Sequence, residues 1–196
     1  MKKIAFLLFV SVQALLFAQE LKVKDPFTVV VREEVGDLNR DGFDDETVIS
    51  MDTANADEPL KLDIFFGDAK GKLKLQFSSS KIMENQYSNG KYLGNHIPYF
   101  MIEDGFLVMI SEKDSVHFIH KFLYKNGKFE LQNYDSVHYN GDSIKETFFN
   151  LISGEKTDVL TEFVGSNNEE KKIEKKLLIR PLPTLENFRS LEHRWK

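Results

Sequence analysis

The stretch Tyr99-Phe100-Met101-Ile102-Glu103-Asp104-Gly105-Phe106-Leu107-Val108-Met109-Ile110 consists of two apolar runs on either side of Asp104-Gly105. Asp-Gly is typical of a two-residue type I′ hairpin turn, because both central residues must take positive φ. Such a turn fixes the register, which pairs Ile102 with Leu107, Met101 with Val108, and Phe100 with Met109. Both faces of the hairpin are apolar, so we expect other parts of the chain to cover both sides and the hairpin to lie at the centre of the fold.

A second hairpin is predicted at Asn126-Gly127, a dipeptide with the same turn preference. Its register pairs Tyr124 with Phe129, Phe122 with Leu131, and His120 with Asn133. One face of this hairpin is aromatic and the other is mixed, which indicates a sheet that is packed on one side.

The remaining sequence predicts more strands and very little helix. Runs rich in β-branched or alternating apolar residues predict strands at Phe27–Val35, Glu46–Met51, Leu60–Phe66, Lys72–Phe77, Lys145–Ile152, Thr157–Phe163 and Ile173–Ile179. Residues 78–97 have no clear period, and we expect a surface excursion or a short helix with a loop there. Thr184 is expected to cap a short helix through residues 185–188. We therefore predict a mainly antiparallel β protein, a sandwich or a strongly twisted meander, with residues 19–196 in one domain.

An acidic loop lies between the first two predicted strands, at Asp37-Leu38-Asn39-Arg40-Asp41-Gly42-Phe43-Asp44-Asp45. Oxygen-bearing side chains occupy its first, third, fifth and ninth positions, and a glycine occupies the sixth. This spacing is typical of a chain that wraps around a hard cation, because glycine allows the sharp turn between the ligands. The simpler alternative to an ion site is a solvated turn rich in Asp and Asn that binds no ion. The register and the concentration of negative charge favour calcium.

The loop and its flanks resemble the calcium loop of the FG-GAP and VCBS families, in which such a run joins two strands. The resemblance covers about 25 residues and implies side-chain ligands at Asp37, Asn39, Asp41 and Asp45, with a backbone carbonyl ligand at Phe43. Those families repeat the unit, whereas this chain has one copy and lacks the Phe-Gly…Gly-Ala-Pro signature, so a propeller is not indicated. The patterns at residues 122–129 and 185–188 resemble small secreted or periplasmic bacterial proteins, without implying an activity.

The N-terminus indicates export. Lys2 and Lys3 precede an apolar run from Ile4 to Phe17, and Ala18 follows, so residues 1–18 are predicted to be a cleaved signal peptide and the mature protein to be periplasmic or secreted. The apolar run is shorter than the roughly 20 residues that a membrane span needs, and no later segment is long enough. Cleavage would change the net charge from −5 to −7, which argues against binding to nucleic acid or anionic lipid.

No catalytic constellation stands out. There is no cysteine and no Gly-x-Ser-x-Gly motif. His117 and His120 are three apart in a predicted strand, so they should point to opposite faces and cannot share an ion. The tyrosines Tyr87, Tyr92, Tyr99 and Tyr139 could form a binding platform, although strand aromatics more often pack within the fold.

Two functions therefore remain. The sequence favours a secreted calcium-binding β domain that is a non-catalytic envelope or extracellular interaction module with a protein or glycan partner. The alternative is a secreted hydrolase acting on glycans or peptidoglycan, with structural calcium, because a catalytic carboxylate pair is a tertiary property that a sequence does not disclose.

Overall fold

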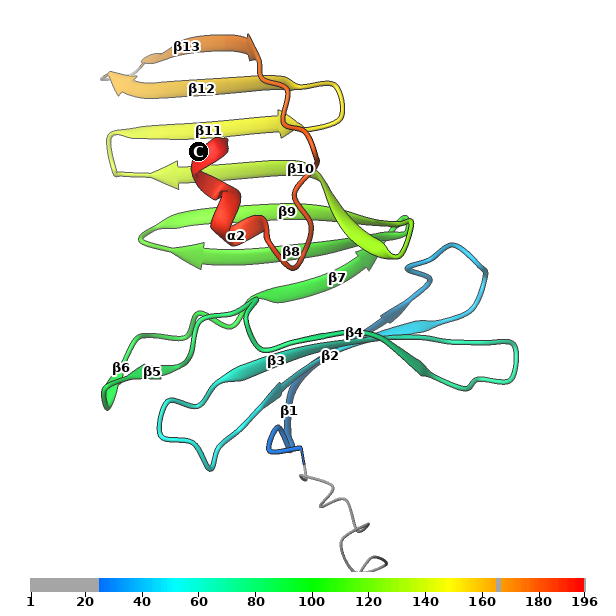
Figure 1. Cartoon of the computed structure of the whole chain (residues 1–196). Coiled ribbons are helices and arrows are strands. Elements are labelled where there is room, and N and C mark those ends of the chain that lie inside the picture. Colours follow the sequence, from blue (N-terminus) through cyan, green and yellow to red (C-terminus); the bar gives the residue numbers. More distant parts are fainter. Residues whose placement is uncertain (1–24, 165–166, 196) are drawn as a thin grey trace, which may run out of the picture.

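The computed structural model describes residues 25–164 and 167–195, which form two antiparallel sheets and a small ribbon (Figure 1). The smaller sheet has the order β1-β2-β3-β4, with bounds Val29–Gly36, Asp45–Met51, Leu60–Phe66 and Lys74–Ser79. The ribbon pairs β5 (Tyr87–Ser88) with β6 (Lys91–Tyr92). The predicted signal peptide, residues 1–18, lies outside the described residues.

The larger sheet is a seven-stranded meander with the order β13-β12-β11-β10-β9-β8-β7. Its strands are β7 (Tyr99–Glu103), β8 (Phe106–Lys113), β9 (Val116–Lys125), β10 (Lys128–Tyr139), β11 (Ser143–Asn150), β12 (Glu155–Val164) and β13 (Asn167–Lys176). One short helix, α2 (Phe188–Leu191), continues into the 3₁₀ turn η1 (Glu192–Arg194). The prediction of a mainly antiparallel β fold with at most one or two short helices is confirmed.

One face of the large sheet carries the core. The ladders place Phe100, Met109, His120, Tyr134 and Phe149 in one row across five strands, and all five side chains are buried. The small sheet covers part of this face, where the Phe66 ring of β3 meets the Tyr124 ring edge-on at 4.7 Å. We call this the inner face.

The C-terminal segment covers another part of the inner face, as Figure 1 shows for α2. The Phe188 ring lies 5.1 Å from the ring of His120 and 5.3 Å from that of Phe122, and the Trp195 ring lies 6.3 Å from that of Tyr134. Lys156, which is also buried on the inner face, donates a hydrogen bond of 2.8 Å to the Trp195 carbonyl oxygen. Aromatic packing and one charged hydrogen bond therefore hold the end of the chain against the sheet.

The registers of both predicted hairpins are confirmed near their turns. Farther from the second turn the register is wrong by one residue: a bulge between Leu131 and Asn133 places Asn133 opposite Lys121, and His120 opposite Tyr134. The extra residue shifts every later pair.

Two further expectations need correction. The first hairpin is not central, because β7 is the edge strand of the large sheet, next to β1. It is also not covered on both sides, because Tyr99 and Met101 on the face opposite Phe100 are exposed. The terminal helix begins at Phe188 instead of following Thr184 directly, because residues 185–187 form a turn that the Asn187 side chain closes onto the Thr184 amide at 2.8 Å. Residues 78–97 contain the β5–β6 ribbon and no helix.

Candidate functional site

The acidic loop between β1 and β2 is held by hydrogen bonds from its own backbone. The Asp37 carboxylate accepts them from the amides of Asp41 (3.1 Å) and Gly42 (2.9 Å). The Asp41 amide also donates to the Asn39 side-chain oxygen at 2.9 Å, and the Phe43 amide donates to the Asp41 carboxylate at 2.9 Å. Gly42 takes a φ of +87°, which explains why glycine occupies this turn position.

These bonds bring three of the predicted ligands together. The Asp41 backbone amide donates to oxygens of both Asp37 and Asn39. The Asn39 side-chain amide donates in turn, at 2.9 Å, to the Asp41 carboxylate oxygen that does not accept from Phe43. Each oxygen that accepts one N–H retains a lone pair, so the arrangement keeps acceptor capacity in an exposed loop. The chemistry of this donor set fits a hard cation such as calcium.

Asp45 has a different environment from the other three. Its side chain is fully buried, with 0% exposure. One carboxylate oxygen accepts bonds from the amides of Leu38 (2.9 Å) and Asn39 (3.1 Å), and the other accepts one from Gly67 (3.0 Å). Burial raises the pKa of Asp45 above its usual value, although these three bonds oppose the rise. Asp45 therefore fastens the loop to the β3–β4 turn whether or not it also contacts an ion.

Gly67 is a structural residue that the sequence pattern did not reveal. A Cβ at this position would overlap the carbonyl oxygen of Asp44. The backbones of the acidic loop and the β3–β4 turn approach so closely that only glycine fits. The requirement is tertiary, and nothing next to Gly67 in the sequence signals it.

Arg40 connects the same loop to the large sheet. Its guanidinium donates a bond of 2.6 Å to the Asp104 carbonyl oxygen in the β7–β8 turn and lies 5.6 Å from the centre of the Phe106 ring. The Asp-Gly turn that directs the hairpin thus also contacts the loop. Close by, a Cβ at Gly36 would lie 2.9 Å from the Ile102 side chain, so β1 and β7 pass each other tightly.

The predicted ligands are therefore only partly gathered. Asp37, Asn39 and Asp41 share hydrogen bonds, Phe43 adjoins them through its amide, and Asp45 faces inward. In the part of the chain that the structure describes, no three His, Cys, Asp or Glu side chains form a metal-binding group. Amide and carbonyl oxygens, which supply two of the five predicted ligands, would have to complete the site.

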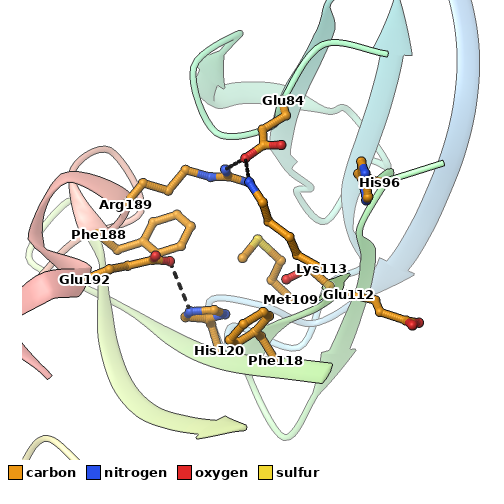
Figure 2. Close-up of a pocket in the computed structure, with 11 residues that line it drawn as sticks. Glu84, His96, Met109, Glu112, Lys113, Phe118, His120, Phe188, Arg189 and Glu192 are labelled. Atoms are coloured by element: carbon orange, nitrogen blue, oxygen red, sulfur yellow. Dashed lines mark hydrogen bonds and ion pairs between the residues drawn. The ribbon is translucent and has the colours of Figure 1, made fainter. Parts of the chain in front are cut away.

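A separate pocket of about 260 Å³ lies where the inner face, α2 and the loop before β7 meet (Figure 2). Met109, Phe118 and His120 come from the sheet, and Phe188, Arg189 and Glu192 from the C-terminal turns. The Glu84 carboxylate lies opposite them and forms ion pairs with Lys113 at 2.9 Å and with Arg189 at 3.4 Å. The pocket thus combines an apolar floor with a charged rim.

Glu84 is the carboxylate of this pocket that pairs with cationic side chains. The hydrogen bond from Lys113 lowers the pKa of Glu84, and the nearby charge of Arg189 acts in the same direction. Glu192 lies 3.9 Å from the buried His120 ring, and Glu112 lies 3.6 Å from His117. His117 is exposed and His120 is buried, which confirms that they point to opposite faces.

The four tyrosines considered as a platform have different partners. Tyr87 and Tyr92 pair across the β5–β6 ribbon with ring centres 5.3 Å apart. The Arg32 guanidinium lies 3.4 Å from the centre of the Tyr99 ring, and Tyr139 packs beside Phe163 at 6.4 Å. The geometry favours local packing over one shared platform.

Comparison with known proteins finds no matching family model, no similar curated protein and no similar solved structure. The resemblance to FG-GAP and VCBS loops therefore depends on the loop residues alone. Within residues 25–164 and 167–195, no helix has the length and apolar character needed to cross a membrane.

Proposed function

We propose that this chain is an exported, calcium-stabilised β module that acts by binding a protein or a glycan and does not catalyse a reaction. The observation that carries the proposal is the acidic loop, in which Asp37, Asn39 and Asp41 are joined by hydrogen bonds of 2.9–3.1 Å. An ordered set of oxygens needs little rearrangement to accept a cation, and preorganisation favours binding.

In this proposal, Asp37, Asn39 and Asp41 hold the ion through side-chain oxygens, Phe43 through its carbonyl, and Asp45 supports them from below. Calcium supplies a positive charge that offsets the repulsion among the carboxylates. Its stabilising effect follows RT ln(1 + [Ca]/Kd), or about 2.7 kcal/mol at a concentration of 100 times Kd.

Thermal melts of the mature chain with 5 mM calcium and with EDTA test the metal site. The melting temperature of the wild type should rise with calcium, and that of Asp41→Ala should not. Asp68→Ala is a matched control, because Asp68 is also an exposed turn residue and accepts amide bonds from Lys70 and Lys72 at 2.8 and 3.0 Å. This variant should keep the full calcium response. A wild type that melts identically in calcium and EDTA would remove the metal from the proposal.

Export has its own measurement. Mass spectrometry of the protein recovered from outside the cytoplasm should give a chain that begins at Gln19, after loss of residues 1–18. A chain that retains Met1 in the cytoplasm would contradict the proposal.

The hydrolase alternative is supported by one observation, the pocket that contains Glu84, Glu192 and His120. A glycosidase needs a carboxylic acid whose pKa is raised so that it can donate a proton near neutral pH. The pKa of Glu84 is lowered instead, because Lys113 donates a hydrogen bond to it. Glu84 is therefore unsuited to be that acid, and we retain binding as the proposed function. Turnover of glycan or peptidoglycan fragments that Glu192→Gln abolishes would reverse that judgement.

A further inference from the structure

The pocket beside α2 has the size of a single ring. Its volume of about 260 Å³ lies just below the range of about 300–1,000 Å³ that is usual for sites of drug-sized ligands. Met109 and the half-buried Phe118 ring form its floor, and Phe188 of α2 closes one side (Figure 2). An apolar floor with polar groups above it is typical of a ligand site, and here it would admit one ring-sized part of a larger ligand.

Hydrogen-bond donors and acceptors surround this floor. Figure 2 shows Lys113 and Arg189 converging on Glu84 at one side of the pocket, and Glu192 and His120 lie across from them. Lys113 at 2.9 Å and Arg189 at 3.4 Å both contact the same Glu84 oxygen, Oε1. The second Glu84 oxygen therefore retains acceptor capacity, and an ammonium and a guanidinium have more N–H donors than these two contacts use.

The formal charges of these two carboxylates and two cations cancel. Glu112 also lines the pocket, but in Figure 2 its carboxylate points away from the others, and it lies 3.6 Å from the His117 ring. An anionic ligand would meet two carboxylates and a cationic ligand two cations, so either would bring a charge that the pocket does not balance. A hydroxyl group both donates and accepts hydrogen bonds, so it pairs with either kind of side chain and adds no net charge.

We propose that this pocket binds one neutral sugar ring of a glycan. The inference rests on the proposed function, because it names a glycan as the partner of the binding module. The C–H groups on one face of the ring pack against Phe118 and Met109. Its hydroxyls contact Arg189 and Lys113 on one side and Glu192 on the other. A peptide backbone matches this rim less well, because each N–H only donates and each C=O only accepts.

The simpler interpretation is that Glu84 only ties the segment between β4 and β5 to the large sheet and to α2. It explains both ion pairs of Glu84. Ion pairs between partly exposed side chains contribute little to stability, so on this interpretation the loss of Arg189 would have almost no effect of any kind. The two interpretations therefore differ in whether Arg189 affects the binding of a sugar.

The test is saturation-transfer difference NMR on the mature chain, in calcium and in EDTA. The neutral probes are glucose, galactose, mannose and N-acetylglucosamine at concentrations up to 20 mM. The charged probes are the uronic acid and the amino sugar of whichever ring binds. At least one neutral probe should give a signal with the wild type, and both of its charged forms should bind at least fivefold more weakly.

Variants assign the signal to the pocket. Arg189→Ala should weaken binding about tenfold, because a charged hydrogen-bond donor is lost, while its melting temperature stays close to that of the wild type. Glu192→Gln keeps the size of the side chain and should weaken binding severalfold. Arg194→Ala is the matched control, because Arg194 lies on the neighbouring turn η1 and does not line the pocket, and this variant should bind as the wild type does.

Three results would overturn the proposal: no signal from any neutral probe at 20 mM, a charged probe that binds as well as its neutral form, or unchanged binding by both Arg189→Ala and Glu192→Gln. Loss of the sugar signal alongside an intact calcium response would refute the pocket and leave the metal site standing. A sugar signal without any calcium response would support the pocket and refute only the metal site.

Discussion

Asp45→Ala separates a structural role of this carboxylate from a role as a metal ligand. In EDTA no calcium can bind, so any loss of stability must come from the protein's own contacts. Asp45 accepts three backbone amide bonds of 2.9–3.1 Å, from Leu38, Asn39 and Gly67. Removing the side chain leaves all three donors without this acceptor.

The magnitude follows from how well water can replace the lost acceptor. Leu38 is buried, so its orphaned amide costs about 1–3 kcal/mol, whereas the partly exposed amides of Asn39 and Gly67 cost about 0.5–1.5 kcal/mol each. These contributions share one side chain and do not simply add, so we expect a loss of about 3–4 kcal/mol. In a chain of this length, each kcal/mol lowers the melting temperature by about 2–4 °C.

Urea denaturation in EDTA measures this loss directly. Asp41→Ala is the comparison, since Asp41 is exposed and bonds only within the loop; we expect it to cost less than about 1 kcal/mol in EDTA. Asp45→Asn keeps one oxygen and should fall between the two variants. If Asp45→Ala were as stable as the wild type in EDTA, the amide bonds would not be holding the loop, and our account of the junction would be wrong.

Three further predictions concern backbone contact, the sheet junction and pH. Gly67→Ala should cost roughly 2–4 kcal/mol in chemical denaturation, because its Cβ would overlap the Asp44 carbonyl and neither backbone can yield. Arg40→Ala should cost about 0.5–1.5 kcal/mol in the same assay, because the exposed bond to the large sheet is lost. Burial lowers the pKa of Lys156. Between this lowered pKa and the usual value of 10.5, Lys156 is protonated more often in the unfolded chain than in the folded one, so the free energy of unfolding should rise with pH across that window. Lys156→Met should abolish the rise, which urea denaturation at several pH values between 7 and 10 would reveal.

The sequence predicted features that depend on neighbouring residues. The Asp104-Gly105 and Asn126-Gly127 turns determined the adjacent pairings, because a two-residue turn leaves one register. The bulge after Leu131 escaped prediction, since nothing in the local pattern distinguishes an extra residue from a regular strand. The apolar residues on both sides of the first hairpin led us to expect cover on both sides, but β7 is an edge strand and its Tyr99 and Met101 side chains are exposed.

The candidate site divides in the same way. The spacing of oxygen-bearing side chains in the loop identified the candidate ligands, and in the structure hydrogen bonds join three of them, Asp37, Asn39 and Asp41. The spacing did not indicate that Asp45 would also accept a bond from the distant amide of Gly67, because Gly67 lies in another hairpin. The pocket beside His120 also needed the fold, since its walls come from three separate parts of the chain.

The position of the acidic loop explains why ordering it would affect the whole domain. Asp45 attaches the loop to the small sheet at Gly67, and Arg40 attaches it to the large sheet at Asp104, so one short connection contacts both. A ligand stabilises whichever conformation it binds by its differential affinity for that conformation. An ion that requires the ordered loop would therefore also favour the arrangement in which the two sheets meet. Because hydrogen bonds within the loop help to order it, part of the entropy cost of ordering falls on folding, and less of it would be left for the binding step.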